Sequence, residues 1–163
     1  MQSLFNKMIS TYYIGVDPNL IGHILELKNN HAGLIQQNSS AVGGWHSQRT
    51  SNIEPWFDDQ IKCILHYLQE KYILRMYWFN INSNGNYNKW HTHSPKEIVA
   101  VYYISTPEGS GNIEFRSKTE EKLYSINPKA GQVIIFPGSL EHRVEENLSE
   151  ELRISAGINL KKK

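Results

Sequence analysis

Two histidines, His91 and His93, lie one residue apart in the sequence Trp-His-Thr-His-Ser-Pro at positions 90–95. Side chains at positions i and i+2 of an extended chain leave the same face, so both imidazoles can reach one ion. A third histidine, His142, follows much later, after the apolar run at 131–137. A local pair with one distant ligand suits a metal ion held inside a barrel of strands, whereas a zinc finger needs a second local pair.

Three neutral imidazoles bind a divalent ion strongly and leave coordination positions open for a substrate, which is the arrangement of catalytic metal sites. We therefore predict a shared metal site at His91, His93 and His142, although each of them alone also fits an ordinary surface or half-buried position. Imidazole must be neutral to bind, so metal affinity is expected to fall as the pH drops through about 6.5, the unperturbed histidine pKa. Metal retention well below that pH would favour a carboxylate ligand such as Glu97.

Arg153 and Ser155 lie two residues apart near the start of the last predicted strand, so they share a face. A guanidinium fork and a hydroxyl on one face can together bind one carboxylate. An arginine that points into a barrel is a costly buried charge without an anionic partner, so this pair predicts a bound acid. The alternative is a surface salt bridge between Arg153 and Glu150 or Glu151.

The elements that must position these residues divide into a helical N-terminal part and a strand-rich C-terminal part. A strand is predicted over 10–16 and helices over 19–29 and 54–72, from β-branched residues and from apolar residues at helical spacing. The glycine-containing stretch 42–46, with Trp45, His46 and nearby Arg49, is expected to be an ordinary exposed loop more than a substrate lid. Strand-like runs separated by turn formers then follow at 73–81, 98–104, 112–115, 123–126, 132–136, 143–145 and 152–160.

Several short strands at even spacing are typical of a sandwich or a barrel. We therefore expect a mainly β fold in which N-terminal helices buttress a β-barrel or jelly roll. The chain has 163 residues, the size of one domain. We expect a single domain over 1–163, with a helical buttress and an N-terminal strand in 1–72 and the barrel core in 73–160.

The composition excludes several classes of partner. The formal net charge is +1, so nothing indicates a nucleic acid or a membrane surface, and a small-molecule or peptide substrate is expected. The single cysteine, Cys63, cannot form an internal disulfide and is predicted to be a small core residue of the helix over 54–72. Neither a secretion signal nor a long apolar run is present, so we expect a cytoplasmic protein.

Six motifs follow one another in the second half of the chain: His91-x-His93, Val101-Tyr-Tyr-Ile104, Gly109-Ser-Gly-Asn-Ile-Glu-Phe115, Pro128-Lys-Ala-Gly-Gln-Val-Ile-Ile-Phe-Pro137, His142-Arg-Val144 and Arg153-Ile-Ser155. Their order resembles the Fe(II) and 2-oxoglutarate-dependent oxygenases, in particular a branch known mainly from bacterial and phage genomes. The similarity extends from Tyr77 to Asn159, and the ordered set is far more specific than any single motif.

The resemblance implies a double-stranded β-helix, a jelly-roll barrel with iron inside one open end. It also implies hydroxylation of a substrate with O2 and 2-oxoglutarate, releasing succinate and CO2. Arg153 with Ser155 would bind the distal carboxylate of 2-oxoglutarate. Tyr77 and Asn80, close to the histidine pair in sequence, are further candidates for binding this cosubstrate through polar side chains.

By the same resemblance, His91 and His142 are the two histidine ligands, and His93 stands where most of the superfamily has Asp or Glu. Glu97 is a candidate substitute carboxylate if the Ser94-Pro95 turn bends it back toward the ion. Three imidazoles also suit three-histidine cupins that use no 2-oxoglutarate. A non-enzymatic metal- or carboxylate-binding module is the third alternative, and Arg153 with Ser155 favours the oxygenase.

Overall fold

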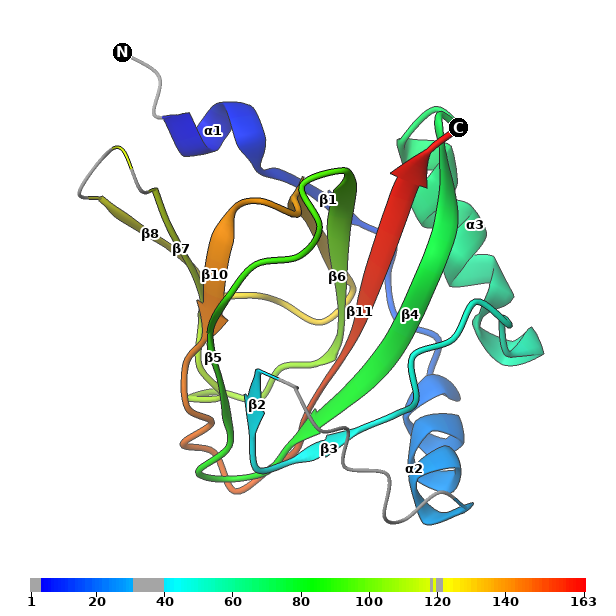
Figure 1. Ribbon diagram of the computed structural model, residues 1–163. Coiled ribbons are helices and arrows are strands. Elements are labelled where there is room, and N and C mark those ends of the chain that lie inside the picture. The colour runs from blue at the N-terminus through cyan, green and yellow to red at the C-terminus, as the bar shows by residue number, and fades with distance from the viewer. Residues whose placement is uncertain (1–3, 31–39, 118, 120–121) are drawn as a thin grey trace.

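The structure is a computed structural model that describes residues 4–30, 40–117, 119 and 122–163. Two antiparallel sheets face each other, and two helices lie against the outer side of the larger sheet (Figure 1). The helices are α1 (Leu4–Met8), α2 (Leu20–Asn30) and α3 (Asp58–Tyr67), and the 3-10 turn η1 (Pro55–Phe57) leads into α3. None of the described helices is long and apolar enough to cross a membrane.

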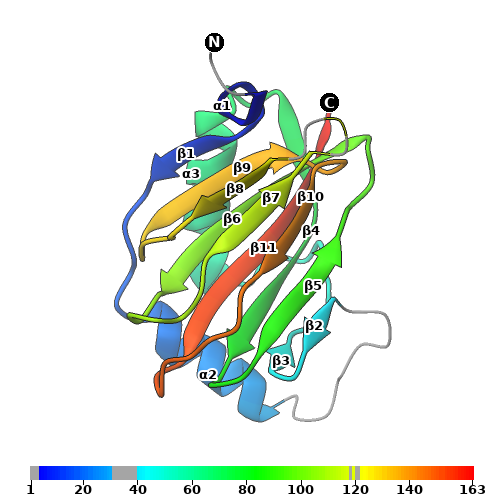
Figure 2. The ribbon, with the colours of Figure 1, turned by 90° about the vertical axis from the view of Figure 1, so that its left-hand side faces the viewer.

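The six-stranded sheet has the order β1-β9-β6-β11-β4-β3, and the five-stranded sheet has the order β2-β5-β10-β7-β8. Figure 2 looks onto the five-stranded sheet, with the larger sheet behind it. The strands are β1 (Ser10–Tyr13), β2 (Ala41–Val42), β3 (Trp45–His46), β4 (Tyr72–Asn82), β5 (Tyr87–His91), β6 (Glu97–Ser105), β7 (Ile113–Arg116), β8 (Leu123–Ile126), β9 (Gln132–Pro137), β10 (Glu141–Val144) and β11 (Arg153–Lys162).

The larger sheet has one apolar face toward the helices and one mixed face toward the smaller sheet. In β4, the alternate residues Tyr77, Phe79 and Ile81 belong to the core that includes residues of α2 and α3. Their neighbours Trp78, Asn80 and Asn82 line a cavity between the sheets. This period of two is what a strand with different surroundings on its two faces requires, and it decides which residues can reach a site inside the barrel.

α3 ends earlier than the sequence predicts. The helix was expected to continue to residue 72, but it stops at Tyr67, and Gln69 and Glu70 both adopt a φ of 54°. These left-handed residues turn the chain into β4, and the backbone N–H of Glu70 donates to the carbonyl of Leu65. Cys63 is exposed on this helix, so the prediction of a core position for it is wrong.

The largest difference from the expected fold lies in the stretch 41–46. Instead of an exposed loop, it forms the two short strands β2 and β3, joined by a turn at Gly43 and Gly44, which have φ of 69° and 74°. β2 pairs with β5 of the small sheet and β3 pairs with β4 of the large sheet. The segment 41–46 therefore joins one edge of each sheet, and part of the segment predicted as a helical buttress belongs to the barrel wall.

Candidate metal centre

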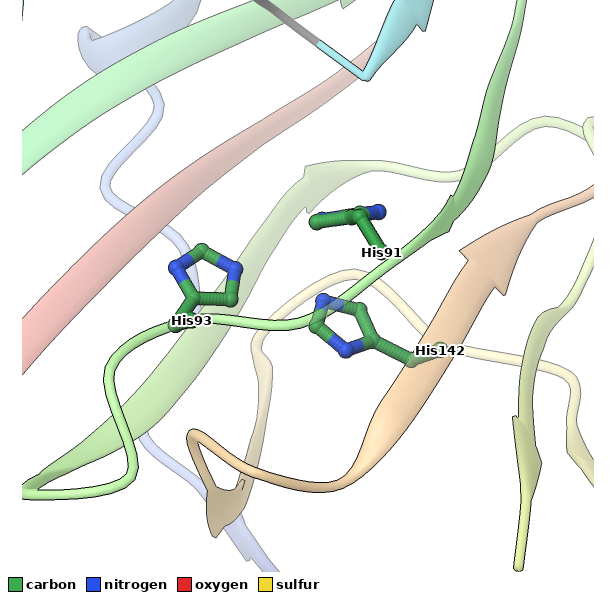
Figure 3. A group of neighbouring side chains, drawn as sticks. All are labelled: His91, His93 and His142. Carbon is green, nitrogen blue, oxygen red and sulfur yellow. The ribbon is translucent and has the colours of Figure 1, made fainter. Parts of the chain in front are cut away.

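The imidazole rings of His91, His93 and His142 come together between the two sheets (Figure 3). Each ring offers one nitrogen, and the three nitrogens all lie within 4.8 Å of one another. His91 is the last residue of β5 and stands directly opposite His142 of β10 in the antiparallel register. Their ring centroids lie 4.2 Å apart, because residues paired across two strands bring their side chains together on one face.

Backbone carbonyls orient two of the three rings. Nδ1 of His91 lies 2.7 Å from the carbonyl oxygen of Lys89, and Nδ1 of His142 lies 2.9 Å from that of Leu140. A carbonyl can only accept, so Nδ1 carries the proton in both rings and Nε2 keeps its lone pair for a metal ion. Ser40 Oγ lies 3.4 Å from Nε2 of His91, a long contact that a bound ion would replace.

His93 lies two residues beyond the end of β5 and is positioned by two contacts. Its backbone N–H donates to the carbonyl of Gly138 at 2.7 Å, and its ring stacks on the indole of Trp78 with centroids 5.9 Å apart. A Cβ at position 138 would lie 2.3 Å from the carbonyl oxygen of Ser94, and one at Gly157 would lie 2.4 Å from the Trp78 ring. Only glycine at these positions allows such close approach to the segment and the ring that hold His93.

Burial keeps the three imidazoles neutral. Desolvation lowers the pKa of His142 to about 3 and that of His93 to about 4, and it also lowers the pKa of His91. Repulsion from a charged neighbouring imidazole further lowers the pKa of His142 and His93. Because neutral imidazole is the metal-binding form, the expected decline of metal affinity moves from about 6.5 to lower pH.

Arg153 and Ser155 open into the same cavity from one face of β11, as their two-residue spacing predicts. The Arg153 side chain is buried, and its Nη1 donates to the carbonyls of Ser110 and Gly111, both at 3.2 Å. Its guanidinium lies over the ring of Tyr103, 5.5 Å from the centroid. Among the described residues, no carboxylate forms an ion pair with Arg153, which argues against the alternative of a surface salt bridge.

Further polar atoms beside Arg153 have few partners among the described residues. The Tyr103 hydroxyl, which interacts with the Arg153 guanidinium, and Oδ1 of Asn80 are buried without a hydrogen bond to any other described group, while Nδ2 of Asn80 donates to Ser155 Oγ at 3.4 Å. Burial raises the pKa of Tyr103 to about 12, so its hydroxyl is a neutral donor. A buried guanidinium and unsatisfied polar atoms are costly, so this end of the cavity fits a ligand that carries a carboxylate. Tyr103 was not among the predicted site residues.

Tyr77 is not brought to the cavity. Its hydroxyl donates to the carbonyl of Asn52 at 3.2 Å and accepts from the backbone N–H of Glu54 at 3.0 Å, on the helix side of the large sheet. Tyr77 and Asn80 are three residues apart in β4, so strand alternation places them on opposite faces. Of these two predicted cosubstrate ligands, the structure brings only Asn80 to the site, and the placement expected for Tyr77 is wrong.

The carboxylate of Glu97 is engaged elsewhere. It pairs with Arg75 Nε at 2.8 Å and accepts a hydrogen bond from Asn159 Nδ2 at 3.0 Å. Glu97 is not part of the group of donor atoms around His93, nor does it line the cavity. The structure therefore gives no support to Glu97 as the third metal ligand.

His46 and Arg49 line the cavity, although the sequence placed them in an ordinary surface loop. His46 is buried, and its pKa is lowered to about 4, mainly by desolvation and further by the charges of Arg49 and His91. The guanidinium carbon of Arg49 lies 4.8 Å from the centroid of the Trp78 ring. The available sequence signal was the pair Gly43-Gly44 between Val42 and Trp45, which is typical of a tight turn between two short strands.

This fold and site define a β-barrel protein with a three-histidine centre and a cationic pocket beside it. A family model described as "Putative 2OG-Fe(II) oxygenase" matches residues 76–159, more than half of the chain. The protein belongs to this family of oxygenases, which use Fe(II), 2-oxoglutarate and O2. The resemblance seen in the ordered motifs is thereby confirmed.

Solved structures of similar fold agree with this assignment. A viral collagen prolyl hydroxylase from Paramecium Bursaria Chlorella virus-1 is 17% identical, with a TM-score of 0.69 and coverage of 99% of this chain and 100% of that chain. A prolyl-4-hydroxylase from Pseudomonas putida is 14% identical, with a TM-score of 0.67 and coverage of 98% and 95%. The carbocyclase SnoK from nogalamycin biosynthesis is 10% identical, with a TM-score of 0.73 and coverage of 97% and 81%.

The fold shared with these proteins is the double-stranded β-helix, as predicted. None of the curated proteins matches the sequence.

Proposed function

We propose that the protein is a hydroxylase that binds Fe(II) through His91, His93 and His142 and converts 2-oxoglutarate and O2 to succinate and CO2 as it oxidises a second substrate. The proposal is supported by three ring nitrogens within 4.8 Å of one another, two of them freed for the metal by carbonyl contacts at Nδ1. The donor set fits a divalent iron, for which imidazole is a suitable ligand.

The observation that carries the cosubstrate assignment is the buried Arg153, without a carboxylate partner among the described residues, in the same cavity as the histidines. We assign to Arg153 and Ser155 the distal carboxylate of 2-oxoglutarate. Asn80 and Tyr103 supply additional polar atoms at this end. A charge-assisted fork to a carboxylate is among the strongest polar contacts in proteins, so Arg153 fixes the orientation of the acid toward the histidines.

Bound iron, together with the keto acid, would supply the activation of O2 and the oxidising power. The chain's own residues hold the acid, keep the imidazoles neutral and restrict water. Val99, Val101 and Ile113 form an apolar part of the cavity wall, which limits the solvent around the reacting groups.

The test is succinate formation by the iron-loaded protein with 2-oxoglutarate, in the wild type and in Arg153→Gln. We expect turnover in the wild type and a KM for 2-oxoglutarate raised about tenfold to a hundredfold in the variant, since a hydrogen bond to a charged group contributes about 1.5–3 kcal/mol. Arg116→Gln is the matched control, because Arg116 pairs with Glu141 outside the cavity. Absence of succinate in the wild type, or an unchanged KM in Arg153→Gln, would contradict the proposal.

The substrate class and the setting are also part of this proposal. Two of the similar structures are prolyl hydroxylases and one is a carbocyclase of nogalamycin biosynthesis, so their substrates are of peptide or small-molecule type. We propose a substrate of one of these types for this chain, a single oxygenase domain over 1–163, and a cytoplasmic location in agreement with the single cysteine.

A further inference from the structure

The cavity that holds the three histidines has no acidic side chain among its described lining residues. It contains imidazoles, two guanidiniums, amides, hydroxyls and apolar groups. The lining residues with polar or charged side chains are Ser40, His46, Arg49, Trp78, Asn80, Asn82, Asn88, His91, His93, His142, Arg153 and Ser155. Apart from the metal ion that its imidazoles would bind, a cavity of this composition favours anionic ligands.

Its two guanidiniums are in different situations. Arg153 is buried, and its Nη1 is held by two backbone carbonyls. Arg49 is exposed at the rim, and its guanidinium stacks on Trp78, the same indole on which His93 stacks. Within the described part of the chain no carboxylate pairs with Arg49. The Trp78 indole therefore contacts both the solvent-accessible Arg49 guanidinium and His93 of the metal centre.

The net charge of the cavity stays positive after 2-oxoglutarate has bound, which favours binding of a second anion. Fe(II) with Arg49 and Arg153 brings four positive charges to a cavity whose imidazoles are neutral ligands, and 2-oxoglutarate brings two negative charges. With His93 in place of the carboxylate that is common in such iron sites, no side chain of the lining carries a negative charge, and Glu141 and Glu145 act on His91 and Arg153 only from outside the lining. A second negatively charged group near the rim is therefore electrostatically favourable.

We propose that the substrate to be oxidised carries an anionic oxygen group, a carboxylate or a phosphate, and that Arg49 binds this group at the rim of the cavity. Trp78 fixes the guanidinium plane, so the fork of Arg49 is preorganised for two oxygen atoms. The bound anion would hold the remainder of the substrate over the metal centre. This assignment rests on the proposed function and specifies its substrate class.

The first test measures binding without turnover. Protein saturated with Zn(II) and 2-oxoglutarate, which occupies Arg153, is titrated with inorganic phosphate, acetate or acetamide while the Nε–H NMR resonance of Arg49 is followed. We expect phosphate or acetate to shift this resonance and acetamide not to shift it. The anion that shifts it at lower concentration identifies the phosphate or the carboxylate class. A resonance that neither anion moves would overturn the proposal.

Calorimetric titration of the same anions compares Arg49→Gln with the control Arg116→Gln. We expect affinity about tenfold lower in Arg49→Gln, and wild-type affinity in the control, because one charge-assisted contact is removed. Arg49→Lys keeps the charge and should recover part of the affinity. If Arg49 only supports Trp78, then Arg49→Gln lowers the unfolding temperature and binds the anions as the wild type does, which contradicts the proposal.

The second test uses iron-loaded enzyme and pairs of compounds that differ only as acid and primary amide. We expect the acids to stimulate succinate formation about tenfold more than the amides, with KM for the acid raised about tenfold in Arg49→Gln. Equal stimulation by acids and amides would refute the role of Arg49. If instead the protein bound no 2-oxoglutarate, phosphate would bind at both Arg49 and Arg153, and Arg49→Gln would remove one of these two sites. Failure of the 2-oxoglutarate assignment is thereby distinguished from failure of the Arg49 assignment.

Discussion

The buried histidines predict that the metal-free protein loses stability steeply in weak acid. Burial lowers the pKa of His142 to about 3 and those of His93 and His46 to about 4, from 6.5. Below pH 6.5 the unfolded chain takes up protons that these folded histidines do not accept. Their contribution to the free energy of unfolding is therefore complete above 6.5 and is lost as the pH falls toward 4, by about 1.4 kcal/mol per pH unit for each group.

His142→Gln isolates the contribution of one group. The pKa of His142 in the folded protein is about 3. This residue should therefore account for about 2 kcal/mol of the decrease in the free energy of unfolding between about pH 7 and about pH 5. We expect the free energy of unfolding of the metal-free protein, measured with urea, to decrease with falling pH in both proteins. The decrease should be smaller by this amount in His142→Gln than in the wild type. His66→Gln is the matched control, because His66 is an exposed histidine on α3, outside the cavity.

The metal-bound state should respond differently. Protons compete with the metal for the imidazoles, but burial lowers the pKa of His91 and brings those of His93 and His142 to about 4 and about 3, so Zn(II) should stay bound to the wild type at about pH 5.5. Equilibrium dialysis at this pH measures the bound metal directly. Two results would refute the reasoning that burial keeps these histidines neutral. One is an equal pH dependence of the free energy of unfolding in the wild type and His142→Gln, and the other is loss of Zn(II) already near pH 6.5.

Three further substitutions test single contacts of the site. Glu97→Gln should retain the full metal stoichiometry measured by atomic emission, because its carboxylate is bound to other side chains, and loss of the metal would make Glu97 a ligand. Tyr103→Phe should raise the Kd of 2-oxoglutarate about fivefold to tenfold in calorimetry, since it removes a buried hydroxyl beside Arg153, and an unchanged Kd would exclude that contact. Gly157→Ala should lower both the unfolding temperature and the metal affinity, because its Cβ would displace Trp78. A stable variant with full metal affinity would contradict the role of that glycine.

The parts of the site that the sequence predicts depend on short-range rules. His91 and His93 share a face because of extended backbone, and Arg153 shares one with Ser155 for the same reason. The position of His142 after an apolar strand gave the distant third donor. The barrel itself follows from short strands separated by turn formers, and the helices from apolar spacing. Apart from the link between the local histidine pair and the distant His142, each of these signals lies within a short stretch of sequence, so it can be read without knowledge of the tertiary fold.

The site residues that the sequence misplaced or missed depend on tertiary contacts, or on which face of a strand a side chain takes. Closeness in sequence reveals neither. Tyr77 is close to the histidine pair in sequence, but side chains alternate along β4, and Tyr77 lies on the face that packs against the helices. His46 and Arg49 enter the cavity only because β2 and β3 pair with strands of different sheets. Tyr103 lies beside Arg153 only because β6 pairs with β11. For Glu97, the competing partners Arg75 and Asn159 come from other strands.

The metal centre is built into the register of the smaller sheet. His91 and His142 face each other across β5 and β10, and the pairing is irregular between His142 and Val144, which pairs with Asn88. A slip of one residue would turn one imidazole to the outer face, since side chains alternate along a strand. A bound metal ion therefore stabilises only the native pairing of these strands. Metal binding and the correct register of β5 and β10 must for this reason be thermodynamically coupled, and each favours the other by the same free energy.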